Sequence, residues 1–432
     1  MKINVKAITA ALLCGTILIC SACSGTKTET SSQVSTESKS STISEAVSDK
    51  GSEAPSEDGE ESKADVTSDE QSEGEESTEE SKTDESSEGE ESVDQSSTEE
   101  SKDESSDETS KSTIHKTPDP SDEKEKGALP ALADDDGSDV GFMSNGLLIY
   151  NRTAYELFYG YDDLAKDYSA AISKLKSSLG DGIKIYNLLI PTHCGVTLPD
   201  RFYGEYGIAD QKEYLDTITS TYTADITGIN AYDIIAHHRD EYVYFNSDHH
   251  WTGLAAYYAY KAFCNAAGID CIPLSQMTEG TIDGYYGSLT NYIDESLVDP
   301  DTVHYYTMDK DTSTTRYDSY GQGPQDTVLI HTYASSSFAY GVFLGGDNPL
   351  LVCKNNDGNG KKIAVVHESY GNAFCPYIAL TYSETHMIDM RDFDIDFKQY
   401  IKDNGIDEII VINNAMATAT PFICEQLEAF AG

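Results

Sequence analysis

The chain has 432 residues, with 76 acidic against 29 basic side chains, which gives a formal net charge of −47. Residues 24–136 carry 36 Asp and Glu with 10 Lys and contain no Phe, Trp or Tyr, so all aromatic residues follow position 141. This charge excludes a protein that binds nucleic acid phosphates or coats an anionic lipid surface.

The N-terminal sequence predicts an export signal. Two lysines precede a mostly apolar run at 7–19, which has the length of a signal-peptide core and is short for a membrane span. The run ends at Cys23 in a pattern that resembles a bacterial lipobox, although Cys20 stands where Leu is usual. We therefore expect residues 1–23 to be a lipoprotein signal peptide and Cys23 to be lipidated. An ordinary secretory signal that leaves the protein unanchored is the alternative.

Residues 24–136 predict a disordered tether. Their low-complexity runs of Ser, Glu, Asp and Thr cannot bury enough apolar surface to offset the entropy of the chain. A flexible coil of this length spans roughly 60 Å root-mean-square, and its charge extends it further. The remaining residues, 137–432, are enough for one large domain or two small ones.

Periodic patterns predict alternating strands and helices after residue 141. Apolar residues at helical spacing indicate helices, and short continuous apolar runs indicate buried strands. In chain order these are a strand at 147–150, a helix at 162–179, a strand at 182–190, helices at 210–219 and 251–267, a strand at 362–367, a helix from about 372 and a strand at 408–413, with a less regular Tyr-rich stretch at 283–343. This alternation favours an α/β fold with a mainly parallel sheet.

Asp248 and His250 form the first candidate site, just before the predicted helix at 251–267. In an extended segment, side chains two residues apart point the same way. The carboxylate could then lie beside the imidazole and fix its tautomer, as a catalytic Asp does for a base. Thr252 is the predicted N-cap of the helix.

Ser369 is the second candidate, directly after the predicted strand at 362–367. It lies at the carboxyl edge of the sheet, where α/β proteins bind ligands. Free amides at the start of the following helix suit a developing oxyanion. A Ser after a strand is common, and a lone Asp–His pair is more often structural or a metal ligand. From the residues alone, a Ser/His/Asp hydrolase-like site is therefore one of several possible interpretations.

A metal-dependent hydrolase is a rival reading, because His237-His238 and Asp248-His249-His250 supply nitrogen and oxygen donors. Adjacent histidines point apart on most backbones, which argues against a shared ion.

Six cysteines follow the predicted signal. Cys264 and Cys271 are close enough in sequence to form a disulfide, and most of the six are expected to be small buried side chains. These six cysteines include no CxxC pair of the kind found in zinc ribbons and thioredoxin sites, and the one such spacing, Cys20 and Cys23, lies in the predicted signal.

Residues 244–252, Tyr-Phe-Asn-Ser-Asp-His-His-Trp-Thr, followed by Ala-Ala-Tyr-Tyr-Ala-Tyr at 255–260, resemble the signature of the bacterial DHHW protein family. Members of that family are similar to the SGNH-hydrolase-like alginate O-acetyltransferases. The resemblance covers most of 141–432 and extends to the blocks at 186–192, 284–289, 345–349 and 365–391. It implies an α/β fold in which residues 137–432 form an SGNH-hydrolase-like three-layer domain.

The resemblance implies that Ser369 is the nucleophile, His250 the base and Asp248 the carboxylate that holds the base. The Asp–His pair precedes the serine, as in these proteins. Glu368 departs from the pattern, since Asp is expected before the serine, and so does His367, where Lys or an apolar residue is more usual. The further candidates for oxyanion and substrate contacts are Tyr370, Gly371, Asn372, Arg391, His249 and Trp251.

The implied activity is transfer of an acetyl group to a sugar hydroxyl of a cell-surface polysaccharide, or to water. It requires no metal and no diffusible cofactor. The implied partners are a glycan, a membrane-bound acyltransferase that passes acetyl groups outward, and the membrane through the lipid anchor, with no nucleic acid. Because 137–432 carries a net charge of −23, a neutral sugar is the expected acceptor. A non-catalytic polysaccharide-binding protein is the alternative.

Overall fold

The computed structural model describes residues 125, 127–132 and 141–432. The expected signal peptide, the lipidation residue Cys23 and nearly all of the expected tether lie outside these residues. None of the helices in the described part is long and apolar enough to cross a membrane.

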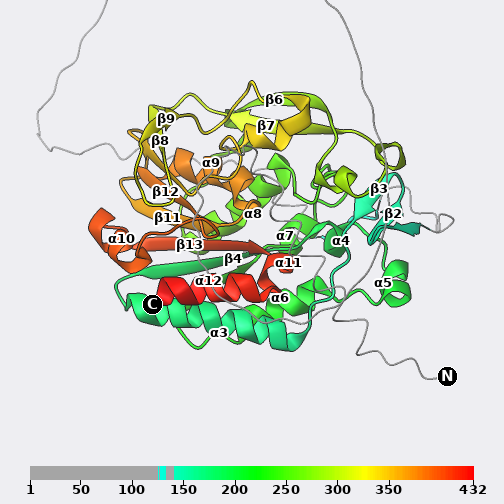
Figure 1. Ribbon diagram of the computed structural model, residues 1–432, viewed down its shortest axis with the longest axis horizontal. Coiled ribbons are helices and arrows are strands. Elements are labelled where there is room, and N and C mark those ends of the chain that lie inside the picture. Colours follow the sequence, from blue (N-terminus) through cyan, green and yellow to red (C-terminus); the bar gives the residue numbers. More distant parts are fainter. Residues whose placement is uncertain (1–124, 126, 133–140) are drawn as a thin grey trace, which may run out of the picture. The chain divides into compact units, whose positions relative to one another are not determined.

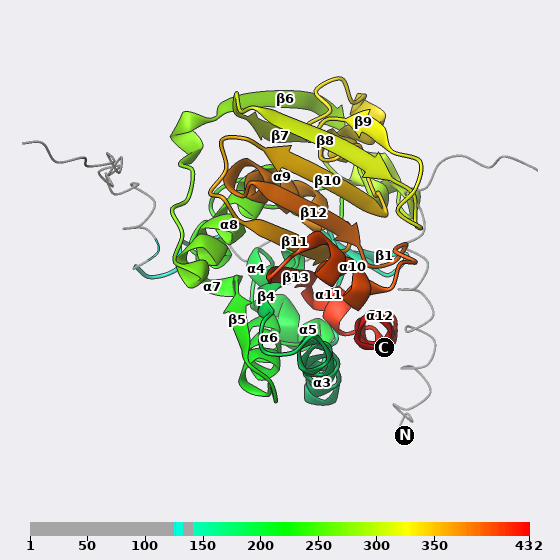
Figure 2. The ribbon, with the colours of Figure 1, turned by 90° about the vertical axis from the view of Figure 1, so that its left-hand side faces the viewer.

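An eight-stranded sheet runs through the domain (Figures 1 and 2). Parallel pairings join the first five strands in its order, and antiparallel pairings add the last three. The mainly parallel sheet expected from the sequence is therefore a mixed one. From edge to edge its strands are β5 (Ile226–Asn230), β4 (Lys184–Ile190), β13 (Glu408–Asn414), β11 (Lys362–His367), β12 (Glu384–Asp389), β10 (Leu350–Asn355), β8 (Thr312–Tyr317) and β9 (Gln325–Thr327).

Helices cover both faces of the sheet and complete three layers (Figure 1). Side chains of β4 alternate between the faces, so that Leu188 joins one apolar core and Leu189 the other. One face carries α3 (Asp162–Leu179), α6 (Gln211–Ser220), α10 (Phe397–Asn404) and α12 (Pro421–Ala431), and the other carries α7 (Tyr232–Ala236), α8 (Gly253–Ala267) and α9 (Gly371–Thr381). Shorter helices are α4 (His193–Val196), α5 (Arg201–Tyr206) and α11 (Ala415–Thr418).

The strongly periodic segments fold as predicted, because their local pattern agrees with their place in the layers. The predicted strand at 147–150 is β2 (Leu147–Tyr150), and the helix at 162–179 is α3. The helix predicted at 251–267 is α8, and the Thr252 hydroxyl accepts a hydrogen bond from the Ala255 amide as its cap. The other predicted elements correspond to β4, α6, β11, α9 and β13.

The Tyr-rich stretch at 283–343 is more regular than predicted. It contributes β8 and β9 to the main sheet, while β6 (Thr278–Tyr285) and β7 (Asp301–Thr307) pair with each other. β8 reads Thr-Ser-Thr-Thr-Arg-Tyr, which contains no apolar run and gives no strand signal. Its remaining turns are η4 (Ser288–Asn291), η5 (Glu295–Leu297) and η6 (Ser336–Val342), and η3 (Leu274–Gln276) precedes it.

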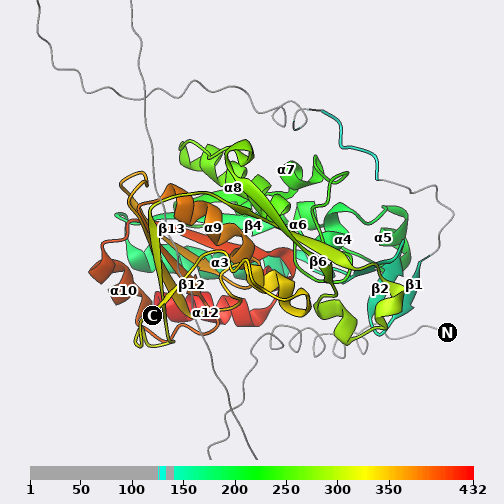
Figure 3. The same cartoon turned by 90° about the horizontal axis from the view of Figure 1, so that it is seen from above.

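A separate small sheet lies beside α4 and α5 (Figure 3) and consists of β1 (Phe142–Ser144), β2 and β3 (Thr153–Tyr155). The Ala154 amide donates to the Asn246 carbonyl over 2.9 Å, and the Thr153 hydroxyl donates to the Asn246 side chain over 3.0 Å. These bonds fasten the small sheet to the segment that carries Asp248.

Residues 127–132 and Glu125, which the sequence assigns to the tether, contact the α7–α8 region. Arg239 Nε donates to the Pro130 carbonyl over 2.6 Å. Lys261 Nζ lies 2.8 Å from Glu125 Oε1. Both partners of the ion pair are largely buried, so this part of the chain packs on the domain.

All six cysteines of the described chain are free thiols. Cys194, Cys264, Cys353 and Cys375 are buried, as expected of small apolar side chains. In this structure Cys264 and Cys271 do not form the bridge that their spacing allows.

Candidate active site

The three predicted catalytic side chains meet at the carboxyl ends of the parallel strands. Ser369 lies just beyond the end of β11, between this strand and α9. Asp248 and His250 come from the segment that leads into α8. In an α/β sheet this edge is where ligands bind, because the connections there leave side chains and helix N-termini open to a ligand.

A continuous chain of hydrogen bonds joins the three side chains, and all of them are buried. His250 Nε2 lies 2.8 Å from Ser369 Oγ, and His250 Nδ1 lies 2.6 Å from Asp248 Oδ1. An ionised carboxylate only accepts, so Nδ1 carries the proton and the Nε2 lone pair receives the serine hydroxyl. This geometry can remove a proton from Ser369 Oγ and turn it into a nucleophile.

The Asp248–His250 contact forms through a turn. Asp248 Oδ1 also accepts the backbone amide of His250 over 2.8 Å, which closes an Asx-turn. Residues 246–250 form bends, and the segment is closed by an isolated bridge between Tyr244 and Trp251. The predicted contact is present, whereas the extended conformation from which we predicted it is wrong.

The second oxygen of Asp248 is held by the end of β6 and the residues that follow it. Asp248 Oδ2 accepts the Tyr285 hydroxyl and the Ser288 amide, each over 2.7 Å. A side chain at Gly287 would bring its Cβ within 2.2 Å of Asp248 Cβ, so the close approach needs glycine. Burial by itself raises the pKa of Asp248, but the adjacent imidazoles of His250 and His249 and the Ser288 amide outweigh it and lower the pKa well below its usual range. The carboxylate therefore stays ionised.

A further buried carboxylate, Asp301, holds the residues before Asp248. It starts β7 and accepts the Asn246 amide over 2.7 Å, the Ser247 amide over 2.9 Å and the Ser247 hydroxyl over 2.5 Å. The Tyr242 hydroxyl is its fourth donor. Burial raises the pKa of Asp301 in spite of these donors. No sequence pattern marked this residue.

Tyr340 contacts both His250 and Ser369, and no sequence pattern marked this residue. Its ring stacks on the His250 imidazole with centroids 3.8 Å apart and planes 9° apart. Its hydroxyl donates to the Ser369 carbonyl over 3.0 Å. The ring therefore limits rotation of the imidazole while the hydroxyl fixes the serine backbone.

Trp251 and Tyr370, two of the predicted substrate residues, are buried and brace the two catalytic segments against each other. The Trp251 indole donates to the Tyr370 carbonyl over 2.9 Å. In return the Tyr370 hydroxyl donates to the His249 carbonyl over 2.5 Å. Both contacts use backbone acceptors, so these side chains position the segments.

Backbone amides after the serine are mostly occupied. The Tyr370 amide donates to Glu368 Oε2 over 2.9 Å, the Gly371 amide to the Glu368 carbonyl over 2.8 Å and the Asn372 amide to the Ser369 carbonyl over 3.2 Å. Among the amides of this turn in the described chain, that of Ser369 has no protein acceptor and is available to an oxyanion. The free amides expected at the start of the helix after Ser369 are therefore mostly occupied by protein acceptors.

Arg391 and Asn372 meet at Asp347. The Asn372 side-chain amide donates to Asp347 Oδ1 over 2.8 Å, and Arg391 pairs with Asp347 Oδ2 over 2.9 Å. Arg391 also holds the buried Asp389 through two nitrogens. Burial by itself raises the pKa of Asp347, but Arg391 and Asn372 outweigh it and lower the pKa below its usual value. Arg391 therefore positions acidic partners, and Asn372 retains a buried carbonyl oxygen with no hydrogen-bond partner in the described chain.

Glu368 and His367, which depart from the expected family pattern, are both accommodated. Glu368 Oε1 accepts the backbone and side-chain amides of Asn414, each over 3.1 Å, and so ties the end of β11 to the end of β13. His367 Nδ1 lies 2.9 Å from the Glu368 carbonyl. The longer Glu side chain reaches the neighbouring strand and leaves the serine in place.

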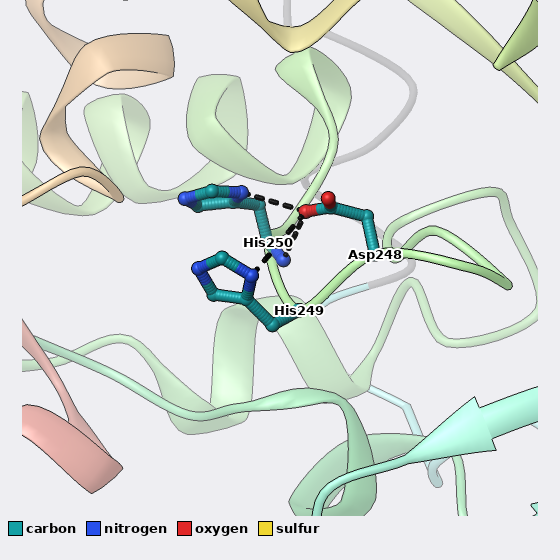
Figure 4. A group of neighbouring side chains, drawn as sticks. All are labelled: Asp248, His249 and His250. Atoms are coloured by element: carbon teal, nitrogen blue, oxygen red, sulfur yellow. Dashed lines mark hydrogen bonds and ion pairs between the residues drawn. The ribbon is translucent and has the colours of Figure 1, made fainter. Parts of the chain in front are cut away.

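His249 lies against His250, with ring centroids 3.7 Å apart (Figure 4). The expectation that these adjacent histidines point apart is wrong, because the turn at Asp248 brings both rings to one carboxylate. His249 Nδ1 lies 2.5 Å from Ser288 Oγ. Glu156, which follows β3, brings a second carboxylate close to His249; burial raises the pKa of Glu156, and the His249 imidazole opposes that shift. No sequence pattern marked Glu156.

Asp248, His249 and His250 are the group in the described chain whose ligand atoms could hold a metal ion, all within 4.8 Å of one another. The four-histidine cluster considered from the sequence is wrong. His237 bonds to the Gly127 and Asp233 carbonyls, and His238 stacks on Tyr258 beside α8. At Asp248 the proton of His250 Nδ1 already fills the space between the two ligand atoms.

Comparison with known proteins gives a consistent result. A family model described as DHHW protein matches residues 48–388. A solved DHHW family protein from Eubacterium siraeum is 27% identical with a TM-score of 0.62, and the match covers 67% of this chain and 97% of that chain. No curated protein matches the chain.

Two further solved structures are more distant. Bacillus cereus PatB1, solved with a sulfonyl adduct, is 19% identical with a TM-score of 0.54, covering 64% of this chain and 96% of that chain. At this identity the likeness shows the fold. The O-acetyltransferase domain of Pseudomonas putida AlgJ is 14% identical over 67% of this chain and 99% of that chain, and its TM-score of 0.37 is too low to carry a conclusion.

Replacing Asp301 by Ala should destabilise the domain, because four donors lose their acceptor, two of them buried and two part-buried. We expect the free energy of unfolding to fall by about 3 kcal/mol, measured by urea denaturation followed by tryptophan fluorescence. Asp299→Ala is the matched control, since Asp299 forms an exposed ion pair with Arg152 and should change the free energy by less than about 1 kcal/mol. Equal effects of the two substitutions would contradict the assigned role of Asp301.

His193, the first residue of α4, gives the domain a specific acid sensitivity. Its ring lies between Tyr155 and Tyr244, with centroids at 4.5 and 5.0 Å, and its Nδ1 has no partner in the described chain. Burial lowers the pKa of His193 to about 3. Between about 6.5, the usual value, and that pKa, the unfolded chain binds a proton that the folded chain does not. Stability due to this residue is therefore lost as the pH falls through that range.

In His193→Phe the ring is kept and the titration is removed. The free energy of unfolding of the wild type should fall more steeply than that of the variant between pH 6.5 and 4, by about 1 kcal/mol per pH unit. Urea denaturation at a series of pH values measures the difference. Parallel curves for the two proteins would contradict this prediction.

Proposed function

This chain belongs to the DHHW protein family, and we propose that it is an exported acyl-transfer enzyme that moves an acetyl group to a cell-surface polysaccharide through Ser369, His250 and Asp248. The observation that carries the proposal is the hydrogen-bond chain from Asp248 Oδ1 through both ring nitrogens of His250 to Ser369 Oγ. The three-layer fold, shared with PatB1, supports an SGNH-hydrolase-like scaffold. The lack of a diffusible organic cofactor is part of the proposal.

In the first half-reaction His250 Nε2 takes the proton of Ser369, and Oγ attacks the acetyl carbonyl of the donor. Asp248 remains ionised and stabilises the imidazolium that forms. The Ser369 amide donates to the oxyanion. When the tetrahedral intermediate collapses, His250 returns the proton to the leaving group, and an acetyl ester on Ser369 remains.

The second half-reaction runs in the opposite direction. A sugar hydroxyl gives its proton to His250 Nε2 and attacks the acetyl carbonyl. The bond to Ser369 Oγ breaks, and Oγ recovers the proton from His250. Water in place of the sugar would give hydrolysis, so the same site supports an esterase when no acceptor is bound.

The acetyl donor must be supplied outside the cytoplasm. The N-terminal sequence that ends at Cys23 supports a lipid anchor at the membrane, and a membrane-bound acyltransferase is the partner we propose as the source of acetyl groups. The acidic tether would hold the domain within reach of wall or capsular glycans.

A metal-dependent hydrolase at Asp248, His249 and His250 is the second candidate function, favoured by the proximity of their ligand atoms. An ion bound there would take the Asp248 oxygen and the His250 nitrogen that now bond to each other. It would therefore displace the proton that holds the base in its tautomer.

A chelator should leave the enzyme unaffected if the triad carries the reaction. We expect hydrolysis of 4-nitrophenyl acetate to be unchanged after dialysis against EDTA, with metal content measured by mass spectrometry. The metal-dependent mechanism would be favoured instead if the protein contained stoichiometric zinc, lost activity on chelation and regained it when zinc was added.

Sulfonyl fluoride labelling tests the nucleophile directly. With phenylmethylsulfonyl fluoride, a bond forms between Ser369 Oγ and sulfur, fluoride leaves, and His250 takes the proton. We expect one adduct per chain, located at Ser369 by peptide mass spectrometry. Ser369→Ala should give no adduct and should lower ester turnover by about four to six orders of magnitude. Ser337→Ala, which changes an exposed serine, is the matched control.

Replacing His250 by Ala should mimic Ser369→Ala, because the pair acts as a unit. Turnover close to wild type in His250→Ala would assign the base elsewhere, with His249 as the first residue to test. A wild-type protein that forms neither an acetyl ester nor a sulfonyl adduct at Ser369, and whose Ser369→Ala variant retains every cellular effect, would support the non-catalytic polysaccharide-binding alternative.

A further inference from the structure

Phe338 is an apolar ring held on the backbone beside the candidate active site. It lies in η6 at a kink where φ is −140° and ψ is 39°. A Cβ added to Gly341 would lie 2.0 Å from its ring, and one added to Gly346 would lie 3.0 Å from it. The ring therefore rests against two glycines, and one of them, Gly346, has a φ of +95° that favours glycine in any case. Phe338 is nevertheless 45% exposed.

Two short segments connect this ring to the candidate catalytic side chains. Two residues further along η6, Tyr340 stacks on His250 and bonds to the Ser369 carbonyl. The residue after Gly346 is Asp347, which accepts the side chain of Asn372. The exposed ring is thus fixed to the same short segments that hold the base and the serine turn.

Asp347 supplies a polar edge next to the ring. It is half-buried, and each carboxylate oxygen has one protein donor, from Asn372 or Arg391. Each oxygen keeps a second lone pair for another donor. Because one guanidinium is shared between Asp347 and Asp389, the cluster keeps a net negative charge, so this edge suits a hydroxyl donor of a neutral ligand better than an anion.

A sugar ring has the complementary chemistry. The C–H groups on the face of a pyranose carry small positive charges and fit the negative face of an aromatic ring, while its hydroxyls reach polar groups at the edge. Small-ligand sites combine apolar surface and a few placed polar groups in this way. A second exposed aromatic residue, Tyr286, is 36% exposed and follows Tyr285, which holds Asp248.

We propose that Phe338 and Asp347 form the binding position for a neutral pyranose ring of the acceptor glycan, next to Ser369. The proposal rests on acyl transfer from Ser369 and names the substrate class of that reaction. The net charge of −23 over 137–432 disfavours an acceptor rich in uronates. Phe338 would act on acceptor binding and leave formation of the acetyl ester on Ser369 unaffected.

Phe338→Ala separates these two steps. The probes are 4-nitrophenyl acetate, which contains no sugar, and a panel of neutral hexasaccharides, made of glucose, mannose or N-acetylglucosamine, with hexagalacturonate as the anionic member. For a neutral hexasaccharide accepted by the wild type, we expect KM to rise about five- to tenfold in Phe338→Ala. The kcat/KM for 4-nitrophenyl acetate should stay within about twofold of the wild type, and Phe338→Trp should retain acceptor KM.

Phe422→Ala is the matched control, because Phe422 is 44% exposed but lies on α12, on the other face of the sheet. It should leave acceptor KM unchanged. Binding measured calorimetrically in the Ser369→Ala background gives a readout that needs no chemistry, and Phe338→Ala should weaken it by the same factor. Thermal unfolding confirms that the variants are folded.

Two outcomes are distinguishable. Wild-type acceptor KM and wild-type binding in Phe338→Ala, with normal ester turnover, would overturn this inference and leave the proposed function intact. So would a preference of the wild type for hexagalacturonate. An absence of acetyl ester on Ser369 in the wild-type protein would instead overturn the proposed function, while hexasaccharide binding that depends on Phe338 would still support the glycan position.

Discussion

The structure around the candidate site depends on burying one ionised carboxylate. Asp248 can remain charged in the interior only if donors surround it. Its four hydrogen bonds come from His250 on its own turn, from Tyr285 at the end of β6 and from Ser288 just beyond β6. Satisfying this charge forces two segments that are almost forty residues apart to close over each other. Asp301 is a second buried carboxylate that needs donors, and it takes them from the residues just before the turn. The geometry of the candidate site is therefore a consequence of how the chain solvates two buried charges.

This dependence explains which parts could be predicted from the sequence. α3 and β11 carry their own periodicity, and the Asp–x–His spacing is local, so each could be recognised from a few neighbouring residues. Tyr340 and Asp301 act on partners that are 29 and 54 residues away, and spacing carries no information about such contacts. The family blocks at 284–289 and 345–349 were the available signal, because they contain Tyr285, Ser288 and Asp347.

The histidines also show that sequence spacing does not determine which side chains lie together. Four histidines in two adjacent pairs gave the appearance of a metal-binding cluster, yet His238 packs on Tyr258 and bonds to Glu241, apart from the Asp248 turn. His249 and His250 come together because an Asx-turn, which spacing does not reveal, folds the backbone around one carboxylate. Proximity in sequence was misleading for one pair and informative for the other.

The charged groups near the serine turn are paired with one another, so they contribute little to binding a charged acceptor. Arg391 is the cation nearest to the serine turn in the network described above, and it is committed to Asp389 and Asp347. The guanidinium of Arg391 therefore holds Asp347 in position for its hydrogen bond with Asn372, and it is not available to bind an anionic acceptor strongly. With the domain itself acidic, the proposed acceptor would be held by hydroxyl hydrogen bonds and aromatic faces. Under the proposed function those groups are Phe338 and Asp347, which lie between β6 and β10, a part of the chain that also contains β7, β8 and β9. The same part carries Ser288, Asp301 and Tyr340, which hold Asp248, the residues before it and His250. A change of acceptor that keeps this geometry would therefore be confined to exposed positions such as Phe338.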